Sequence, residues 1–136
     1  MSDRDATAEV VRRWLAAFGG PKVDAGAVAE LLHPAATFVE RPNRYSPGGE
    51  RDRETTLASI DLGGAAFPEQ RLEPTHVVVD GETAAVRATW TGVTADGTEL
   101  RSHSALFFTQ RDGLVWRVES YDAFPPPEEP ERTAGT

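Results

Sequence analysis

The sequence of 136 residues contains no cysteine, which excludes disulfide bonds, thiolate catalysis and cysteine-based metal sites. This absence favours a reducing compartment, so we predict a cytoplasmic location. No run of about 20 apolar residues is present, which predicts no membrane span, and no apolar N-terminal run suggests a secretory signal. Basic residues are few, 14 against 22 acidic ones, giving a net charge of −8. We therefore expect no nucleic-acid partner, because binding phosphates requires clustered cations.

Motifs for metals and cofactors are also missing. The three histidines, His33, His76 and His103, do not have the H-x-x-x-H or H-E-x-x-H spacing of zinc sites. The sequence has no G-x-S-x-G, G-x-G-x-x-G or P-loop motif, so a serine hydrolase, a dinucleotide site or a nucleotide site has no support. We predict neither a metal nor a cofactor.

Helical spacing of apolar residues predicts three helices in the first half of the chain. The first begins at a cap at Asp5 or Thr7 and ends at Gly19, and the second begins near Asp24 and ends before Pro34. The third covers Arg53 to Leu62, with Asp52 as its cap. A strand is predicted at residues 36–40, and residues 43–50 are predicted to be a loop because of their Pro, Gly and Asn content.

The second half changes to strand-like runs separated by three Asp-Gly pairs, at 80–81, 96–97 and 112–113. Asp-Gly favours the positive φ angles of hairpin turns, so a four-strand antiparallel meander is predicted. The element order indicates an α+β protein in which helices cover one face of a curved sheet. We predict a single domain over residues 1–124 and a disordered proline- and glutamate-rich tail over residues 125–136.

Four stretches carry a family resemblance: VVRRWLAAF, FVERPNRYSPGG, DGETAAVRATWTG and DGLVWRVESYDAF. From Ala6 to Phe124 the chain resembles the nuclear transport factor 2-like superfamily, and within it the SnoaL-like branch, which includes polyketide cyclases. The resemblance implies a cone-shaped α+β barrel, in which three N-terminal helices pack into a strongly curved mixed or antiparallel sheet around one internal pocket. The same fold serves ketosteroid isomerases, epoxide hydrolases and non-enzymatic binding modules, so it does not settle the function.

Single positions can be compared with the ketosteroid isomerases of this superfamily. Glu40 aligns with their carboxylate base in one register, and Arg41 does so in another. Trp14 takes the place of their hydrogen-bonding tyrosine, and Ala105 takes the place of their protonated aspartate. The resemblance therefore argues against steroid isomerisation. Asp122 resembles the acid that closes the last strand of many SnoaL-like sequences and that serves cyclases as a general acid or base.

Strand alternation gives an independent reason to consider Asp122. In the last strand it follows Leu114, Trp116, Val118 and Ser120 on one row, and that row carries no other charge. Asp122 is either a surface residue at the end of the strand or a pocket residue. In a pocket, burial would raise its pKa and make it a proton carrier near neutral pH.

His103 and Glu40 are the candidate catalytic partners of Asp122. The row of Arg101, His103, Ala105, Phe107 and Thr109 is expected to face the cavity, although His103 could equally be structural. Glu40 could instead be a surface acid paired with Arg41 or Arg44. Arg101 could bind an anion or pair with Glu99, and Asn43 could do no more than form an Asx-turn.

The predicted function is cofactor-independent acid/base catalysis, of isomerase, cyclase or hydratase type, on a small, largely apolar cyclic molecule. The alternative is a non-catalytic binding or accessory protein of the same fold. Apolar residues on the outward sheet rows, Leu106, Phe108, Val115 and Tyr121, favour a homodimer. The predicted substrate-binding residues are Trp14, Phe18, Phe38, Asn43, Tyr45, Trp90, Arg101, Phe107, Trp116 and Val118, and the predicted catalytic residues are Asp122, His103 and Glu40.

Overall fold

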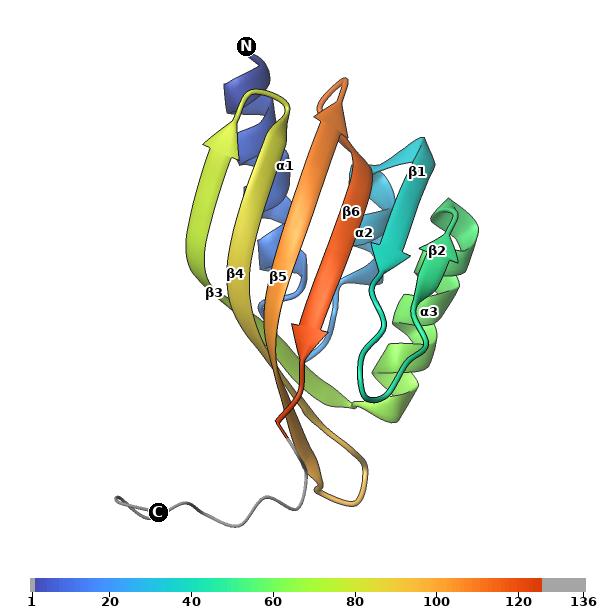
Figure 1. Cartoon of the computed structure of the whole chain (residues 1–136). Helices are drawn as coiled ribbons and strands as arrows, with labels where there is room; N and C mark the ends of the chain where they lie inside the picture. The colour runs from blue at the N-terminus through green and yellow to red at the C-terminus, as the bar shows by residue number, and fades with distance from the viewer. Residues whose placement is uncertain (1, 126–136) are drawn as a thin grey trace, which may run out of the picture.

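The computed structural model describes residues 2–125, which form three helices and six strands (Figure 1). In chain order the elements are α1 (Asp3–Ala17), α2 (Ala25–Leu31), β1 (Leu32–Glu40), β2 (Gly49–Arg51), α3 (Arg53–Ala66), β3 (Glu69–Asp80), β4 (Thr83–Val93), β5 (Glu99–Arg111) and β6 (Leu114–Ala123). Most of the predicted tail, residues 126–136, lies outside the described residues.

Side-chain caps fix the starts of all three helices. Asp24 accepts a hydrogen bond from the N–H of Ala27 at 3.0 Å, and Asp52 accepts one from the N–H of Thr55 at 2.8 Å, so both predicted caps are confirmed. The predicted start of α1 was wrong, because Ser2 caps this helix and accepts from the N–H of Asp5 at 3.1 Å. Ser and Asp are comparable capping residues, so the sequence did not distinguish between these starts.

The six strands form one mixed sheet in the order β2-β1-β6-β5-β4-β3. The three predicted hairpins are formed between β3 and β4, β4 and β5, and β5 and β6. Their glycines, Gly81, Gly97 and Gly113, have positive φ angles of 57°, 89° and 75°. β1 lies parallel to β6, which brings the first strand of the chain beside the last. β2 was not predicted, because its three residues fall in a glycine-containing loop.

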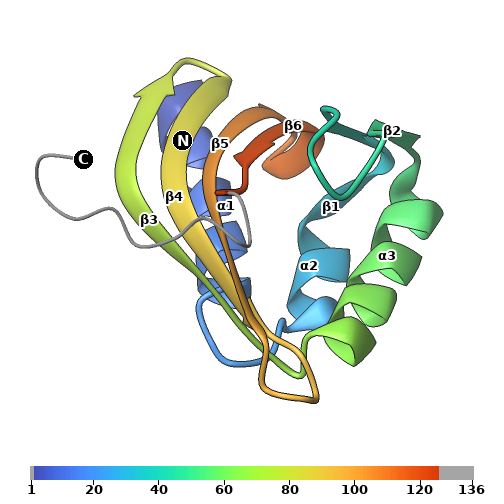
Figure 2. The same ribbon diagram turned by 60° about the horizontal axis from the view of Figure 1, so that its bottom comes forward.

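The helices pack on the sheet at different places. α1 contacts β3, β4 and β5, α3 contacts β1 and β2, and α2 contacts both of the other helices. Figure 2 shows α2 and α3 side by side and α1 lying across the long strands. Between α1 and the sheet, Val10, Val11 and Trp14 are almost fully buried together with Phe108.

The side-chain register of β5 is opposite to the predicted one. Ser102, Ser104, Leu106 and Phe108 are buried, whereas His103 is exposed and Phe107 is 48% exposed. The expectation that Leu106 and Phe108 face outward was therefore wrong. Alternation separates the two rows of β5 without saying which is inward, and the row with Leu106 and Phe108 is the one that packs toward α1.

A β-bulge changes the alternation of β6. Thr109 pairs with Arg117 and Gln110 pairs with Val115, so Trp116 has no residue opposite it in β5. As a result Val115 and Val118 are both 1% exposed, and the prediction that Val115 faces outward was wrong. Val118, Ser120 and Asp122 keep the predicted row, but Trp116 is separated from them.

The α+β class, the three helices and the mixed sheet agree with the prediction. The predicted cone-shaped barrel with a strongly curved sheet is not confirmed, since β2 and β3 are the two edges of an open sheet. Within residues 2–125 no helix is long and apolar enough to cross a membrane.

Candidate functional site

A pocket of about 250 Å³ lies between the helices and the inner face of the sheet. One part of its wall is aromatic and aliphatic, and another part carries hydroxyl, amide and charged groups. The apolar lining consists of Trp14, Phe18, Phe38, Leu72, Trp90, Leu106 and Phe124; the polar lining consists of Glu40, Arg51, Gln70, Ser102, Ser104, Ser120 and Asp122.

Asp122 lies at the polar wall, directly opposite Ser104 in the β5–β6 pairing. The Ser104 hydroxyl donates a hydrogen bond to Asp122 Oδ1 at 2.6 Å. Ser104 and Ser120 are 5% and 4% exposed, so bulk water reaches these hydroxyls poorly. Asp122 is partly buried, which agrees with a pocket position rather than a solvent-facing strand end.

The surroundings of Asp122 raise the pKa of its carboxyl above the ordinary value. Burial is the main cause, because it disfavours the charged form, and the negative charge of Glu40 adds to the rise. The Ser104 hydroxyl opposes the shift by stabilising the carboxylate. The net effect keeps the carboxyl protonated at a higher pH than a solvent-exposed aspartate.

Glu40 enters the same pocket from the end of β1. Its Oε1 accepts a hydrogen bond from Arg51 at 2.9 Å and another from the Ser46 hydroxyl at 2.8 Å. The alternative, a surface acid paired with Arg41 or Arg44, is not what the structure has, because the β1–β2 pairing places Arg51 beside Glu40. Glu40, rather than Arg41, thus faces the pocket. Arg51 also lies over the ring of Phe38, 5.8 Å from its centre.

The aromatic wall is tied together by ring contacts. Trp14 and Phe18 stack with ring centres 5.2 Å apart, and Trp90 meets Phe124 edge-on at 6.3 Å. The indole N–H of Trp90 donates to Gln70 Oε1 at 3.2 Å. The ring of Tyr45 packs against that of Phe124, with ring centres 4.9 Å apart, so Tyr45 supports a pocket residue without lining the pocket itself.

Other predicted site residues lie away from this pocket. His103, Arg101 and Phe107 are exposed on the opposite face of the sheet, because the register of β5 is reversed. Arg101 lies 3.8 Å from Glu99, and both side chains are more than half exposed. The placement of His103, Arg101 and Phe107 in the cavity was therefore wrong.

Three further expectations change for local reasons. Trp116, predicted to bind substrate, does not line the pocket: its ring lies 4.8 Å from the ring of His33 and 4.2 Å from the guanidinium carbon of Arg111. Val118 is buried in the core and does not line the pocket. Asn43 Oδ1 accepts the N–H of Tyr45 at 2.9 Å, which is the Asx-turn considered from the sequence.

Reversal of the β5 register also alters the comparison with ketosteroid isomerases. Ala105 faces away from the pocket, and the neighbouring inward residue is Ser104. Ser104 therefore supplies a hydroxyl to the pocket wall beside the position at which the sequence comparison found only the methyl group of Ala105.

Sequence reasoning missed much of the polar lining. Arg51 belongs to the short strand β2, and Gln70 lies at the start of β3, where no motif marks either residue. Ser102 and Ser104 could have been found from the sequence, since they lie on the same row of β5 as Leu106 and Phe108, and this row is the more apolar of the two. That row, rather than the one containing His103, fits a buried face.

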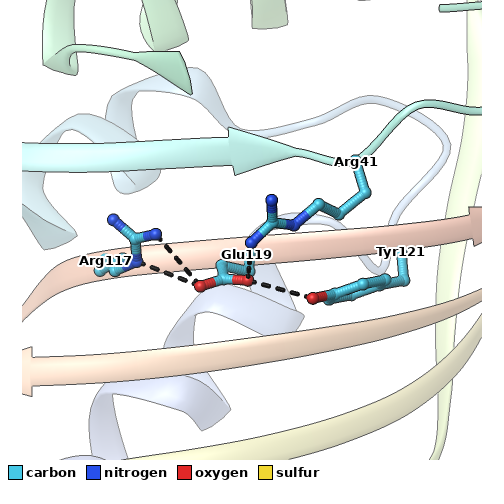
Figure 3. Close-up of polar contacts among 4 residues, drawn as sticks. All are labelled: Arg41, Arg117, Glu119 and Tyr121. Carbon is cyan, nitrogen blue, oxygen red and sulfur yellow. Dashed lines mark hydrogen bonds and ion pairs between the residues drawn. The ribbon is translucent and has the colours of Figure 1, made fainter. Parts of the chain in front are cut away.

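The outer face of the sheet carries a separate charged cluster, shown in Figure 3. Glu119 accepts hydrogen bonds from Arg41 at 2.9 Å, from Arg117 at 3.1 Å and from the Tyr121 hydroxyl at 3.3 Å (Figure 3). The two guanidinium groups lower the pKa of the Glu119 carboxyl. In this cluster two guanidinium groups share one carboxylate, and none of its four residues lines the inner pocket.

The inner pocket suits proton transfer more than metal chemistry. No group of three or more His, Asp or Glu side chains within residues 2–125 is placed to hold a metal ion. The pocket instead contains one carboxyl whose pKa is raised and one carboxylate paired with Arg51. Two acids in such different surroundings can take different roles, and Asp122 is the one suited to exchanging a proton.

Structural comparison shows the same fold in several solved proteins. A predicted SnoaL-like polyketide cyclase from Jannaschia is 20% identical, with a TM-score of 0.71 over 88% of this chain and 86% of that one. A protein with a ketosteroid isomerase-like fold from Catenulispora acidiphila, solved with trimethylamine, is 19% identical, with a TM-score of 0.71 over 85% of each chain. A predicted ketosteroid isomerase from Kribbella flavida is 24% identical, with a TM-score of 0.66 over 99% of this chain and 89% of that one.

No curated protein sequence matches the chain significantly. The model of the SnoaL-like domain, however, matches residues 11–118, which include the second half of α1, the β1 strand with Glu40, and most of the sheet. The matched region covers well over half of the chain and agrees with the resemblance found in the sequence. The chain therefore belongs to the SnoaL-like domain family.

Proposed function

We propose that this protein is a cofactor-independent acid/base enzyme that acts on a small, largely apolar cyclic molecule in the inner pocket. Asp122 is the group that takes up and releases the proton. The observation that carries this proposal is the position of Asp122: a carboxyl with a raised pKa in an aromatic-lined pocket. A carboxyl of this kind is a better proton carrier near neutral pH than an ordinary aspartate.

Glu40 is the proposed partner of Asp122. Its contacts with Arg51 and Ser46 hold the Glu40 carboxylate in place, so it acts on Asp122 through its negative charge. A negative charge near Asp122 favours the protonated acid, as the raised pKa indicates. His103 is no longer a candidate, because it lies on the other face of the sheet.

The size and lining of the pocket limit the substrate. A cavity of ~150 Å³ holds one benzene molecule, so about 250 Å³ suits a compound of one or two rings. The aromatic wall would bind its apolar body, and the polar wall would meet one oxygen-bearing edge. Isomerisation, cyclisation and addition or elimination of water all require proton transfer at such an edge.

Deuterium exchange tests this proposal without knowledge of the natural substrate. Cyclohexanone and β-tetralone are incubated with the protein in deuterium oxide, and incorporation next to the carbonyl is followed by NMR. We expect the wild-type protein to accelerate exchange and Asp122→Asn to reduce the acceleration at least ~10²-fold. Asp61→Asn, on the exposed surface of α3, is the matched control and should exchange like the wild type. Equal rates for the wild type and Asp122→Asn would contradict the role of Asp122.

A binding protein without turnover is the second candidate. It is favoured by the commitment of Glu40 to Arg51 and Ser46, which leaves Asp122 as the single carboxyl in the pocket without an ionic partner among the described residues. Trp14 and Trp90 line the pocket and should report binding through their fluorescence. Fluorescence changes that saturate with β-tetralone while exchange stays at the background rate would favour this candidate.

A homodimer formed through the outer sheet face is a further part of the proposal. Phe107 and Tyr121 lie edge to face there at 5.7 Å and are 48% and 44% exposed. Exposed neighbouring aromatic rings favour contact with another protein surface. Sedimentation should give twice the 14.7 kDa chain mass, and Phe107→Glu should give the single-chain mass. A monomer at all concentrations would contradict this assembly.

A further inference from the structure

Two serines connect Asp122 to another part of the pocket wall. Ser104 Oγ lies 2.6 Å from Asp122 Oδ1, and Ser102 Oγ lies 2.9 Å from Ser104 Oγ. Ser102 and Ser104 are two residues apart in β5, so both side chains leave the same face of the strand. Both line the pocket, although the residues are only 1% and 5% exposed.

The protonation state of Asp122 fixes the direction of these hydrogen bonds. A charged carboxylate can only accept, so Ser104 gives its single hydroxyl hydrogen to Asp122, and Ser102 must then donate to Ser104. When Asp122 carries a proton on Oδ1, it can donate to Ser104, which then donates to Ser102. The hydrogen of Ser102 is then free to point at a ligand in the pocket.

We propose that Ser104 and Ser102 form a hydroxyl relay that carries a proton from Asp122 to the carbonyl oxygen of a small cyclic ketone or aldehyde. This inference rests on the proposed function and narrows its substrate class to carbonyl compounds. The other charged groups facing the pocket, Glu40 and Arg51, bind each other. They therefore leave the relay with Asp122 as its proton source.

The proposed step balances without any further reactant. The O–H bond of Asp122 breaks as its proton passes to Ser104, Ser104 passes its own hydrogen to Ser102, and Ser102 passes its hydrogen to the carbonyl oxygen. Asp122 is then a carboxylate and removes a proton from the carbon next to the protonated carbonyl. The ketone has become an enol, Asp122 is again an acid, and both serines are restored.

The first test needs no substrate and measures the coupling within the relay. The Asp122 carboxyl is titrated by carbon NMR in the wild type, Ser104→Ala, Ser102→Ala and the double variant. Loss of the Ser104 hydrogen bond should raise the pKa of Asp122 by about one unit. Loss of Ser102 should raise it by a few tenths, because Ser102 acts by polarising Ser104.

Ser102→Ala should have no further effect on this pKa when Ser104 is already alanine. Ser120→Ala is the control, since it removes another buried hydroxyl of the pocket that is outside the relay. Its effect should persist in the Ser104→Ala background. An unchanged pKa in Ser104→Ala, or a Ser102 effect that persists without Ser104, would overturn the relay.

The second test uses deuterium exchange into β-tetralone. Ser102→Ala should lower the exchange rate about 10²-fold, as expected for loss of a hydrogen-bond donor to a developing oxygen charge. The double variant should be no slower than the slower single variant, because the two serines act as one unit. Asp61→Asn, on the exposed surface of α3, is the control and should exchange like the wild type.

The outcomes separate the relay from the function on which it rests. Exchange that depends on Asp122 but is equal in Ser102→Ala and the wild type would overturn the relay and leave the acid/base function standing. Absence of exchange in the wild type would count against the function, and the pKa titrations would still decide whether the two serines are coupled to Asp122.

Discussion

The ion pair between Glu40 and Arg51 should contribute measurably to stability, and this contribution can be isolated by a double-mutant cycle. The Nη2 of Arg51 lies 2.9 Å from Glu40 Oε1, and the two side chains remain only 28% and 20% exposed. Glu40→Gln and Arg51→Met each remove one charge while keeping side-chain length. The double variant removes both, so the cycle reports the energy of the pair itself.

The expected coupling energy follows from the exposure of the pair. Exposed ion pairs typically contribute about 0.2–1 kcal/mol, whereas breaking a fully buried pair costs about 3–5 kcal/mol. The pair of Glu40 and Arg51 lies between these limits, because both side chains are mostly buried but still reach solvent. We expect a coupling energy of about 1–2 kcal/mol, smaller than the buried-pair figure because water screens part of the attraction.

Urea unfolding of the wild type, the two single variants and the double variant measures this energy. The exposed pair of Glu9 and Arg12, with side chains 47% and 67% exposed, provides the matched control through Glu9→Gln and Arg12→Met. A coupling for Glu40 and Arg51 no larger than that of the control pair would refute the reasoning. Carbon NMR adds an independent check, because Glu40→Gln should lower the pKa of Asp122 by removing a neighbouring negative charge.

Three further changes have expected effects on stability, all measurable by urea unfolding. Asp122→Asn should raise the free energy of unfolding at pH 7 but not at pH 3. The pKa of Asp122 is raised in the folded protein, so the protein loses stability as the pH rises from the unfolded pKa of about 3.9 through the folded pKa. The loss is about 1.4 kcal/mol for each pH unit between the two pKa values. An equal effect at both pH values would contradict this. Gly92→Ala should destabilise the protein by about 1–3 kcal/mol, because the added methyl group would collide with the ring of Trp90; unchanged stability would mean that this ring moves freely. Thr7→Val should cost about 1–2 kcal/mol, since the buried Thr7 hydroxyl donates to the carbonyl of Gly81 at 2.8 Å, and a cost near zero would show that water replaces it.

Local chemistry determined the parts of the fold that the sequence predicted well. Asp24 and Asp52 cap helices because a carboxylate satisfies the free N–H groups of a first helical turn. The Asp112-Gly113 turn forms because both residues adopt positive φ angles, of 57° and 75°, that few other residues tolerate. These interactions span only a few residues, so the sequence contains all the information that they require.

The candidate site was only partly predictable, and Asp122 and His103 show the difference. The pocket position of Asp122 could be predicted because its row is otherwise uncharged and includes Val118 and Ser120, which are buried. The prediction for His103 was wrong because it placed the less apolar row of β5 inward, whereas the row with Ser104, Leu106 and Phe108 packs toward α1. The prediction that Trp116 lines the pocket was wrong because a β-bulge leaves Trp116 unpaired, and no local sequence pattern indicated this bulge.

The tertiary structure alone decided which polar groups meet in the pocket. Glu40 lies near Asp122 because β1 pairs in parallel with β6, with Glu40 opposite Ser120 although the two are 80 positions apart in the chain. Arg51 reaches Glu40 through the short β1–β2 pairing. The sequence by itself determined the helices, the hairpins and the membership of Asp122 in an inward row, because these depend on neighbouring residues. Contacts between distant strands depend on how the whole sheet is ordered, and that order is set by the packing of all its elements together.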